Sequence, residues 1–244
     1  MTSGPRAWAR LAGEIESCAR CPRLRDYGAK VARERRRAFA DQEYWGRPVP
    51  GFGDRDARIL VVGLAPAAHG AHRTGRMFTG DRSGEWLYAA MHRAGLASAP
   101  RSVARDDGLE LLGAFVTAPC RCAPPANRPT AEELARCAEY LEREVDLLGR
   151  LRVIVALGGV AWNAIHAFGR RRDPERAPRP RPRFAHGAES VLGVGPGRRP
   201  VILLGCYHVS QQNTFTGRLT RAMLDDVLAR AVRHARVDFE VVGR

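Results

Sequence analysis

The sequence predicts an α/β protein, a three-layer αβα sandwich around a mostly parallel central sheet. Short, unbroken apolar runs recur along the chain, as is typical of strands that are buried on both faces of a sheet. Amphipathic segments of helical length lie between these runs. A chain of 244 residues with 45% hydrophobic residues can also fill one sizeable core, so we expect a single domain over residues 1–244.

The first half of the chain supplies two of the predicted strands. We expect a helix over residues 6–20 that ends at Cys21-Pro22, then a basic run and an aromatic, proline-rich loop that reaches residue 53. The strands cover residues 58–64 and 114–118, and the helices that follow them cover about 83–94 and 130–148. The second of these helices opens with the capping-box pattern Thr130-Ala131-Glu132-Glu133.

The second half repeats the alternation. Strands are predicted at 152–157 and 201–205, with a helix from Gly158-Gly159 to about Phe168 and a final helix over about 218–234. Residues 169–187 are rich in Arg and Pro, so we expect a basic loop without regular structure there. The stretch 237–242 fits either a strand or an ordered tail.

Four loops are predicted to leave the carboxyl ends of the strands, where ligands bind in open parallel sheets. They also hold the polar residues that packing explains least. These loops cover residues 65–84, 119–129, 158–159 and 207–217.

The charge balance indicates a polyanionic partner. The formal net charge is +14, and Lys30 is the single lysine, so the other 39 of the 40 basic residues are arginine. Guanidinium groups pair with phosphate in a planar, bidentate way. Arginine in place of lysine is also typical of GC-rich genomes, so the net charge is the stronger argument.

Membrane and secretory classes are disfavoured. The longest strongly apolar stretch, 59–68, is too short to cross a bilayer. The first ten residues contain no apolar segment that could serve as a secretory signal. Six cysteines without such a signal favour reduced thiols over a disulfide framework, so we expect a cytoplasmic protein.

Four of the cysteines form two separated pairs, Cys18 with Cys21 and Cys122 with Cys137. A local C-x-x-C and two distant thiols can close a four-thiolate site that ties the N-terminal segment to the body of the fold. Such a site holds either an iron–sulfur cluster or zinc, and the alternative is a set of unconnected core cysteines. Cys120 competes with Cys122 as the third ligand.

Two loop sequences make the pattern specific. The first runs from Gly63-Leu64-Ala65-Pro66-Ala67-Ala68-His69-Gly70 to Gly75-Arg76-Met77-Phe78-Thr79-Gly80-Asp81-Arg82-Ser83-Gly84, and the last is His208-Val209-Ser210-Gln211-Gln212-Asn213-Thr214-Phe215-Thr216-Gly217. With the cysteines, they resemble the uracil-DNA glycosylase superfamily, most closely its iron–sulfur family 5, over roughly residues 10–235.

The resemblance implies a monomeric DNA repair enzyme that hydrolyses the N-glycosidic bond of deaminated bases and leaves an abasic site. It also implies a [4Fe-4S] cluster held by Cys18, Cys21, Cys122 and Cys137. Cys122 is favoured over Cys120 because the Pro-Pro-Ala-Asn segment that follows it matches the family. Cys206 is expected to be a packed free thiol.

Three kinds of catalytic role follow from the resemblance. Phe78 would support the extruded base, unless it is only a core aromatic, and His208 would lie by the leaving base. Related enzymes place an acid or amide in the first motif, where this chain has Ala65-Pro66-Ala67-Ala68. We therefore expect Asp81 to activate the water, with Asn127 second and His69 third. Asp81 is alternatively a helix cap, and Asn127 a turn residue.

The base pocket is predicted to be tolerant. Strict uracil enzymes read the base edge with an asparagine, and here Ala118 takes that place, so uracil and hypoxanthine are both expected substrates. Further pocket residues are Ala65, Ala67, Phe78, His69 and Asn213. The predicted DNA contacts are Gln211, Gln212, Phe215 and Arg218, with Phe215 as the wedge into the duplex.

Two other function classes share part of the pattern. A non-catalytic metal-containing DNA-binding module would have the charge and the cysteines, but would not need Phe78, Asp81 and His208 around one crevice. An iron–sulfur electron carrier would share only the thiols. Because Lys30 lies outside every predicted loop, no lysine is placed to form a Schiff base, and water is the expected nucleophile.

Overall fold

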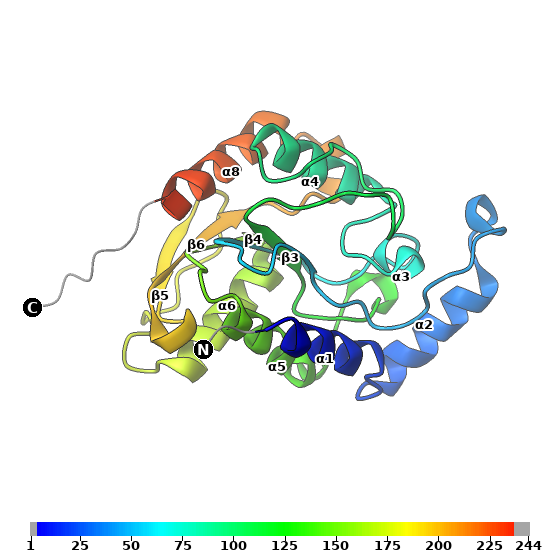
Figure 1. The fold of residues 1–244 in the computed structure, drawn as a ribbon, viewed down its shortest axis with the longest axis horizontal. Helices are drawn as coiled ribbons and strands as arrows, with labels where there is room; N and C mark the ends of the chain where they lie inside the picture. The colour runs from blue at the N-terminus through cyan, green and yellow to red at the C-terminus, as the bar shows by residue number, and fades with distance from the viewer. Residues whose placement is uncertain (1–3, 237–244) are drawn as a thin grey trace, which may run out of the picture.

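The computed structural model describes residues 4–236, which form three αβα layers (Figure 1). The six strands of the sheet lie in the order β1-β3-β2-β4-β6-β5. The inner four are parallel to one another and the two edge strands are antiparallel, so the predicted mostly parallel sheet is confirmed. The strands are β1 (Phe52–Gly53), β2 (Ile59–Val62), β3 (Ala114–Thr117), β4 (Val153–Leu157), β5 (Glu189–Leu192) and β6 (Val201–Cys206).

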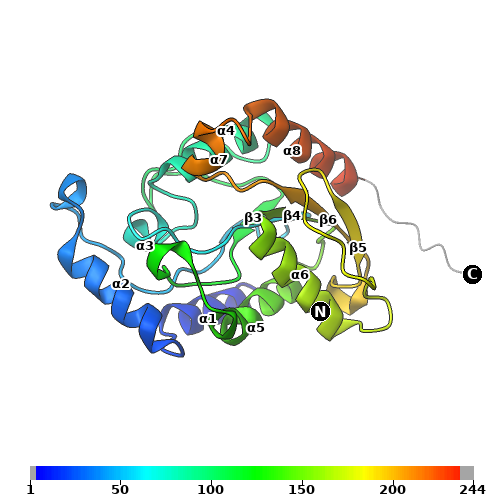
Figure 2. The ribbon, with the colours of Figure 1, turned by 180° about the vertical axis from the view of Figure 1, so that it is seen from behind.

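Helices cover both faces of the sheet. On one face lie α4 (Arg82–Arg93) and α8 (Arg221–Arg236), and on the other lie α1 (Pro5–Glu16), α5 (Ala131–Leu147) and α6 (Gly159–Arg172) (Figures 1 and 2). The inner strands are buried along their whole length. Successive residues of a strand face opposite sides, so Leu60 packs in the α5–α6 core and Val61 in the α4–α8 core.

The N-terminal region differs from the prediction. α1 ends at Glu16 rather than at residue 20, and Pro22 begins a second helix, α2 (Pro22–Glu34), rather than ending the first. Proline is favoured in the first turn of a helix, because its missing N–H has no intrahelical partner there. α2 lies at one end of the molecule (Figure 1).

The prediction that residues 169–187 lack regular structure is wrong for the first four, which are the last turn of α6. The following segment carries no helix or strand, and its Pro182 carbonyl accepts a hydrogen bond of 2.9 Å from Trp162 Nε1. Strand β5, which the sequence did not predict, comes next. The stretch 237–242 lies outside the described residues.

All four predicted loops leave the same edge of the sheet, because β2, β3, β4 and β6 run in parallel register. Two of them contain short helices, α3 (Ala71–Thr74) and α7 (Gln211–Phe215). Single turns of 3-10 helix lie at Arg37–Phe39, Pro125–Asn127 and Pro196–Arg198. Between residues 4 and 236 no helix has the length and apolar character to cross a membrane.

Candidate active site at the carboxyl edge of the sheet

A buried arginine holds the loop that follows β2. Arg76 is 3% exposed, donates to Thr79 Oγ1 (3.0 Å) and Ser102 Oγ (2.6 Å), and forms an ion pair of 2.6 Å with Asp107. Arg76 and the backbone N–H groups that bind Asp107 keep the pKa of this carboxyl at about 2, although burial opposes the shift. The segment that carries Phe78 is therefore held on either side of this residue, because Arg76 precedes it and Thr79 follows it.

Phe78 and His208 come together from the first and last loops. Their ring centroids are 6.4 Å apart and their planes differ by 33°. The Phe78 backbone adopts a φ of 53°, and the ring lies so close to Gly63 that a Cβ there would be 2.6 Å from Phe78 Cζ. Gly63 thus lets the half-buried ring lie across the end of β2.

His208 is held from two sides. Asn213 Nδ2 donates to the His208 carbonyl (2.8 Å), and a Cβ on Gly158, at φ 93°, would lie 3.4 Å from His208 Cβ. Burial lowers the pKa of His208 to about 4, so its imidazole is neutral at pH 7 and can donate one N–H. The amide of Asn213, a predicted pocket residue, thus holds the His208 backbone.

Asp81 caps α4 with one oxygen. Its Oδ1 accepts from the Gly84 N–H (2.9 Å), which confirms the capping interpretation. Its Oδ2 faces Gly70 in the first motif, since a Cβ on that glycine would lie 2.0 Å away. Burial raises the pKa of Asp81, against the opposing effect of the Gly84 and Ser83 N–H groups. Capping and a second role for Oδ2 are therefore compatible.

The other two candidates for activating water differ in setting. His69 Nδ1 lies 3.0 Å from the Tyr44 hydroxyl, and burial lowers the His69 pKa. Asn127 is exposed, with a φ of 55°, in a turn in which its N–H donates to the Pro124 carbonyl (3.1 Å). Among the described residues no hydrogen bond joins Asn127 to Asp81, so its part in the site stays a prediction.

The predicted pocket alanines lie along two of these loops. Ala65 and Ala67 are half-buried just after β2, and Ala118 is buried directly after β3. Their small, apolar side chains add no hydrogen-bonding group to the edge of the sheet.

A buried ion pair that the sequence did not predict supports the loop after β3. Arg121 and Glu144 meet at 2.7 Å with side chains 1% and 2% exposed. Glu144 also accepts from Thr117 Oγ1 (2.6 Å) and the Gly51 N–H (3.1 Å). The available signal was an acidic residue on the apolar face of α5, next to Val145. The pair fixes both Ala118 and the neighbouring cysteines.

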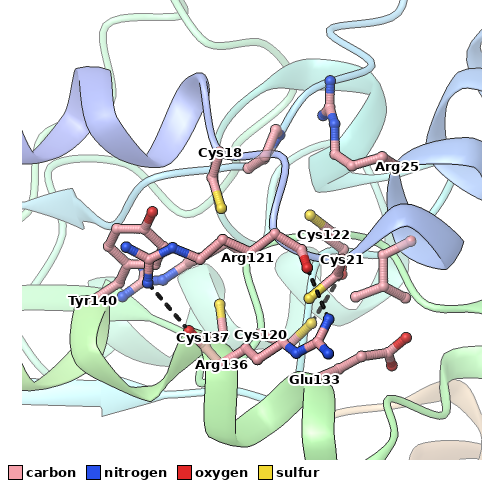
Figure 3. A pocket seen from close by; sticks show the side chains of 13 residues that line it. Cys18, Cys21, Arg25, Cys120, Arg121, Cys122, Glu133, Arg136, Cys137 and Tyr140 are labelled. Carbon is pink, nitrogen blue, oxygen red and sulfur yellow. Dashed lines mark hydrogen bonds between the residues drawn. The ribbon is translucent and has the colours of Figure 1, made fainter.

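Five cysteines line one cavity between the α1–α2 turn, the loop after β3 and α5 (Figure 3). They are Cys18, Cys21, Cys120, Cys122 and Cys137. Within residues 4–236 no group of three or more Cys, His, Asp or Glu side chains is arranged to hold a single ion. The thiols line a common cavity but do not converge on one ion position.

The thiols fit a site that supplies positive charge. Burial raises the pKa of Cys122 to about 12 and that of Cys137 to about 11, and neighbouring thiolates add to both shifts. Several thiolates can be buried together only where a metal compensates their repulsion. Cys120 Sγ donates to the Cys122 carbonyl (3.3 Å) and remains a competing ligand. Cys206 is free and fully buried, as predicted.

Exposed arginines near the same edge lie over aromatic rings. The guanidinium carbon of Arg82 is 4.6 Å from the centroid of the Phe215 ring, and that of Arg218 is 4.7 Å from the Tyr207 ring. Arg221 lies 5.9 Å from the Trp86 ring. Phe215, at the end of α7, is 64% exposed. An apolar ring and exposed cations are thus presented by the segments that follow Asp81 and His208 in the sequence.

Fold and site together define an α/β protein with a candidate ligand site at the carboxyl edge of a mostly parallel sheet, beside a cysteine-lined cavity. A family model described as the uracil DNA glycosylase superfamily matches residues 50–231. A type-5 uracil-DNA glycosylase of Mycobacterium leprae is 52% identical over 236 residues, covering 96% of this chain and 99% of that protein.

A second type-5 uracil-DNA glycosylase, from Thermus thermophilus, is 52% identical over 222 residues, covering 91% of this chain and 95% of that protein. A type-4 uracil-DNA glycosylase of Pyrobaculum aerophilum is 34% identical over 131 residues, covering 53% and 59%. The chain therefore belongs to the uracil-DNA glycosylase superfamily and, within it, to the type-5 family. The family expected from the loop motifs is confirmed.

Proposed function

We propose that this chain is a monofunctional DNA glycosylase that hydrolyses the N-glycosidic bond of deaminated bases in DNA and leaves an abasic site. The observation that carries the proposal is the meeting of Phe78 and His208, with ring centroids 6.4 Å apart, at the carboxyl edge of the sheet. An extruded base needs a flat apolar support and a donor beside its developing negative charge. The type-5 relatives are named for uracil-DNA glycosylase activity.

In this proposal His208 acts on the leaving base and Asp81 acts on the attacking water. The leaving base gains negative charge as the bond breaks, and the neutral His208 imidazole donates a hydrogen bond to it. The second oxygen of Asp81, Oδ2, orients water toward C1′. The raised pKa of Asp81 makes it a better proton acceptor than an ordinary carboxylate. Asn127 and His69 are the next candidates for this role.

Water is the proposed nucleophile. Lys30 is exposed on α2 and lies 3.9 Å from Glu34, so the single lysine belongs to a surface ion pair. In this proposal no lysine amine reaches C1′, so no Schiff base forms there. Borohydride is therefore expected to leave enzyme and substrate unlinked.

A release assay on duplex containing one uracil tests the function. Asp81→Ala should lower the single-turnover rate with little loss of DNA affinity, because water positioning acts mainly in the transition state. His208→Ala removes a donor worth about 3 kcal/mol, roughly a 150-fold loss in rate. Tight binding without release by the unaltered protein would instead identify a non-catalytic DNA-binding module.

The proposed substrate range includes hypoxanthine as well as uracil. Ala118 offers no amide to read the base edge, so a purine leaves no buried polar group unpaired. Ala118→Asn should therefore favour uracil over hypoxanthine, measured as the ratio of single-turnover rates on matched duplexes. Rejection of hypoxanthine by the unaltered protein would contradict this assignment of Ala118.

We further propose that Cys18, Cys21, Cys122 and Cys137 hold a [4Fe-4S] cluster, supported by the cavity that these thiols share (Figure 3). When bound, the cluster supplies a cross-link between the α1–α2 turn and the body of the fold, and hydrolysis needs no redox step. Alanine at any of these four positions should lose iron and solubility, whereas Cys206→Ala should keep the brown colour. Cys120→Ala shows which of Cys120 and Cys122 is the third ligand: loss of iron would assign Cys120, and retention of iron would assign Cys122. Stoichiometric zinc without iron, in protein prepared anaerobically, would contradict the cluster.

DNA is the proposed partner, contacted through Gln211, Gln212, Phe215 and Arg218 by a monomer. We also propose a cytoplasmic location, where cysteines stay reduced and can bind a metal, since none of the six cysteines is in a disulfide.

A further inference from the structure

Arg73 on α3 is a buried cation whose hydrogen bonds all go to neutral acceptors. It is 7% exposed, and its Nε donates to the His69 carbonyl (2.8 Å). Its two terminal nitrogens donate to the Gly80 carbonyl (2.8 Å) and to the side chain of Gln42. The guanidinium carbon also lies 3.9 Å from the centroid of the Phe39 ring.

The charge of Arg76, three residues further on, is compensated in a different way. It is buried in the same loop, but its charge is neutralised at 2.6 Å by Asp107. Taking a guanidinium out of water is unfavourable unless a negative charge compensates. Among the described residues Arg73 has no such contact ion pair, and the carboxylate whose charge acts on it is that of Asp81.

The hydrogen bonds of Arg73 border Asp81 on two sides. Gly80, whose carbonyl Arg73 holds, is the residue before Asp81. His69, held through its carbonyl, precedes Gly70, against which Asp81 Oδ2 lies. A Cβ on Gly80, at φ 79°, would lie 2.5 Å from the Arg73 guanidinium nitrogen, so the guanidinium is packed directly against this backbone.

We propose that Arg73 is a positioning residue for Asp81: its buried guanidinium fixes the two backbone segments beside that carboxylate and adds a positive charge next to them. The inference rests on the proposed function, in which Asp81 orients the attacking water. The hydrogen bond from Arg73 to Gln42 and its contact with the Phe39 ring also make this geometry depend on the segment that follows α2.

The consequence for pH follows from the groups around Asp81. Burial raises its pKa, Glu85 raises it further, and Arg73 with the Ser83 and Gly84 N–H groups opposes the rise. The Tyr88 hydroxyl, also on α4, donates to the Met77 carbonyl and stays neutral. Without the Arg73 charge the pKa of Asp81 rises. Water activation needs the ionised carboxylate, so the rate then begins to fall at a higher pH on acidification.

The test compares Arg73→Gln, which removes the charge but can still donate, with Arg73→Lys, which keeps the charge. Single-turnover uracil release is measured against pH with enzyme in saturating excess. The acid limb should move to a higher pH in Arg73→Gln, since the loss of a nearby opposite charge raises a carboxyl pKa. In Arg73→Lys the limb should stay near its original position even where the rate drops.

The matched control is the double variant Arg76→Gln/Asp107→Asn, which removes a buried cation of the same loop together with its counter-charge. Its acid limb should not move. A shift equal to that of Arg73→Gln would show that disturbance of the loop, rather than the Arg73 charge, sets the limb, and would overturn the inference.

A second measurement does not depend on catalysis. Carboxyl ¹³C NMR of protein labelled at aspartate, with Asp81→Asn to assign the signal, gives the Asp81 pKa directly, and it should rise in Arg73→Gln. An unchanged value overturns the inference. A raised Asp81 pKa with an unmoved acid limb of the rate overturns the role of Asp81 and the inference with it. If the unaltered protein releases no uracil, the proposed function is overturned, while the NMR result still reports on the effect of Arg73 on the Asp81 pKa.

Discussion

Two groups of arginines on this protein carry the same charge in different surroundings. At the end of α6, Arg171 forms an ion pair of 2.5 Å with Glu142 and Arg172 pairs with Asp146, both on α5. Near the carboxyl edge of the sheet, Arg82, Arg218 and Arg221 lie over aromatic rings. Within residues 4–236 none of these three has a carboxylate within ion-pair distance.

The difference determines what each group can bind. A guanidinium held by a carboxylate has its charge neutralised and its donors occupied. One that lies over a ring gains about 0.5–1 kcal/mol at an exposed site and keeps its donors free for phosphate. The net charge of +14 is therefore a poor map of the DNA surface, because part of it is neutralised within the fold.

The predicted basic loop illustrates this. The sequence makes Arg170, Arg171 and Arg172 the densest basic run of the second half, and so a candidate for contacting DNA. In the structure this run is helical, and two of its members pair with α5. The arginines around Phe215 are better placed, because they border the candidate active site.

The largest expected effect is on DNA affinity. Changing Arg82, Arg218 and Arg221 together to glutamine should weaken binding to all sequences, and the slope of log affinity against log salt should fall by about 0.9 for each phosphate that the variant no longer binds. Binding isotherms at several salt concentrations measure this. The matched control changes Arg170, Arg171 and Arg172 to glutamine, with the same loss of formal charge. Equal losses of affinity in the two triple variants would show that both groups of arginines contribute equally to DNA binding.

A smaller effect is expected from the ring that Arg82 covers. Phe215→Ala should slow release from duplex by about tenfold, since aromatic stacking with a base is worth about 1–3 kcal/mol, and should change release from single strands little because only the duplex must be unstacked. Val191→Ala is the control, because Val191 is also exposed (54%) but lies on edge strand β5. Equal slowing on both substrates would exclude the wedge role.

The fold could be predicted well because its strands are unbroken apolar runs, and the topology rule then gathers Phe78 and His208 at one edge. The errors lie where local sequence is ambiguous. The sequence predicts that the first helix ends at Cys21-Pro22, whereas α1 ends at Glu16 and Pro22 begins α2. The last turn of α6 is stabilised by ion pairs with a different helix, which no local pattern of Arg and Pro reveals.

The buried arginines of the site could not be predicted from the sequence for a related reason. Arginine is rarely buried unless it is paired, and the partner of Arg76 is 31 residues away while that of Arg121 is 23 away. Sequence spacing alone does not bring these side chains together. Arg73 is harder still, because its direct acceptors are uncharged and its negative neighbour, Asp81, is not in contact.

The smallest effect concerns stability. The pair of Arg171 and Glu142 is partly exposed, at 51% and 28%, so a double-mutant cycle on unfolding should give a coupling energy of about 0.2–1 kcal/mol. Urea unfolding of Arg171→Ala, Glu142→Ala and the double variant measures it, and high salt should reduce it. Because carboxylate and guanidinium then remain paired in the DNA complex, Arg171→Ala should leave DNA affinity unchanged. A coupling energy near zero together with weaker DNA binding would mean that Arg171 exchanges Glu142 for phosphate, and the two arginine groups would no longer differ in kind.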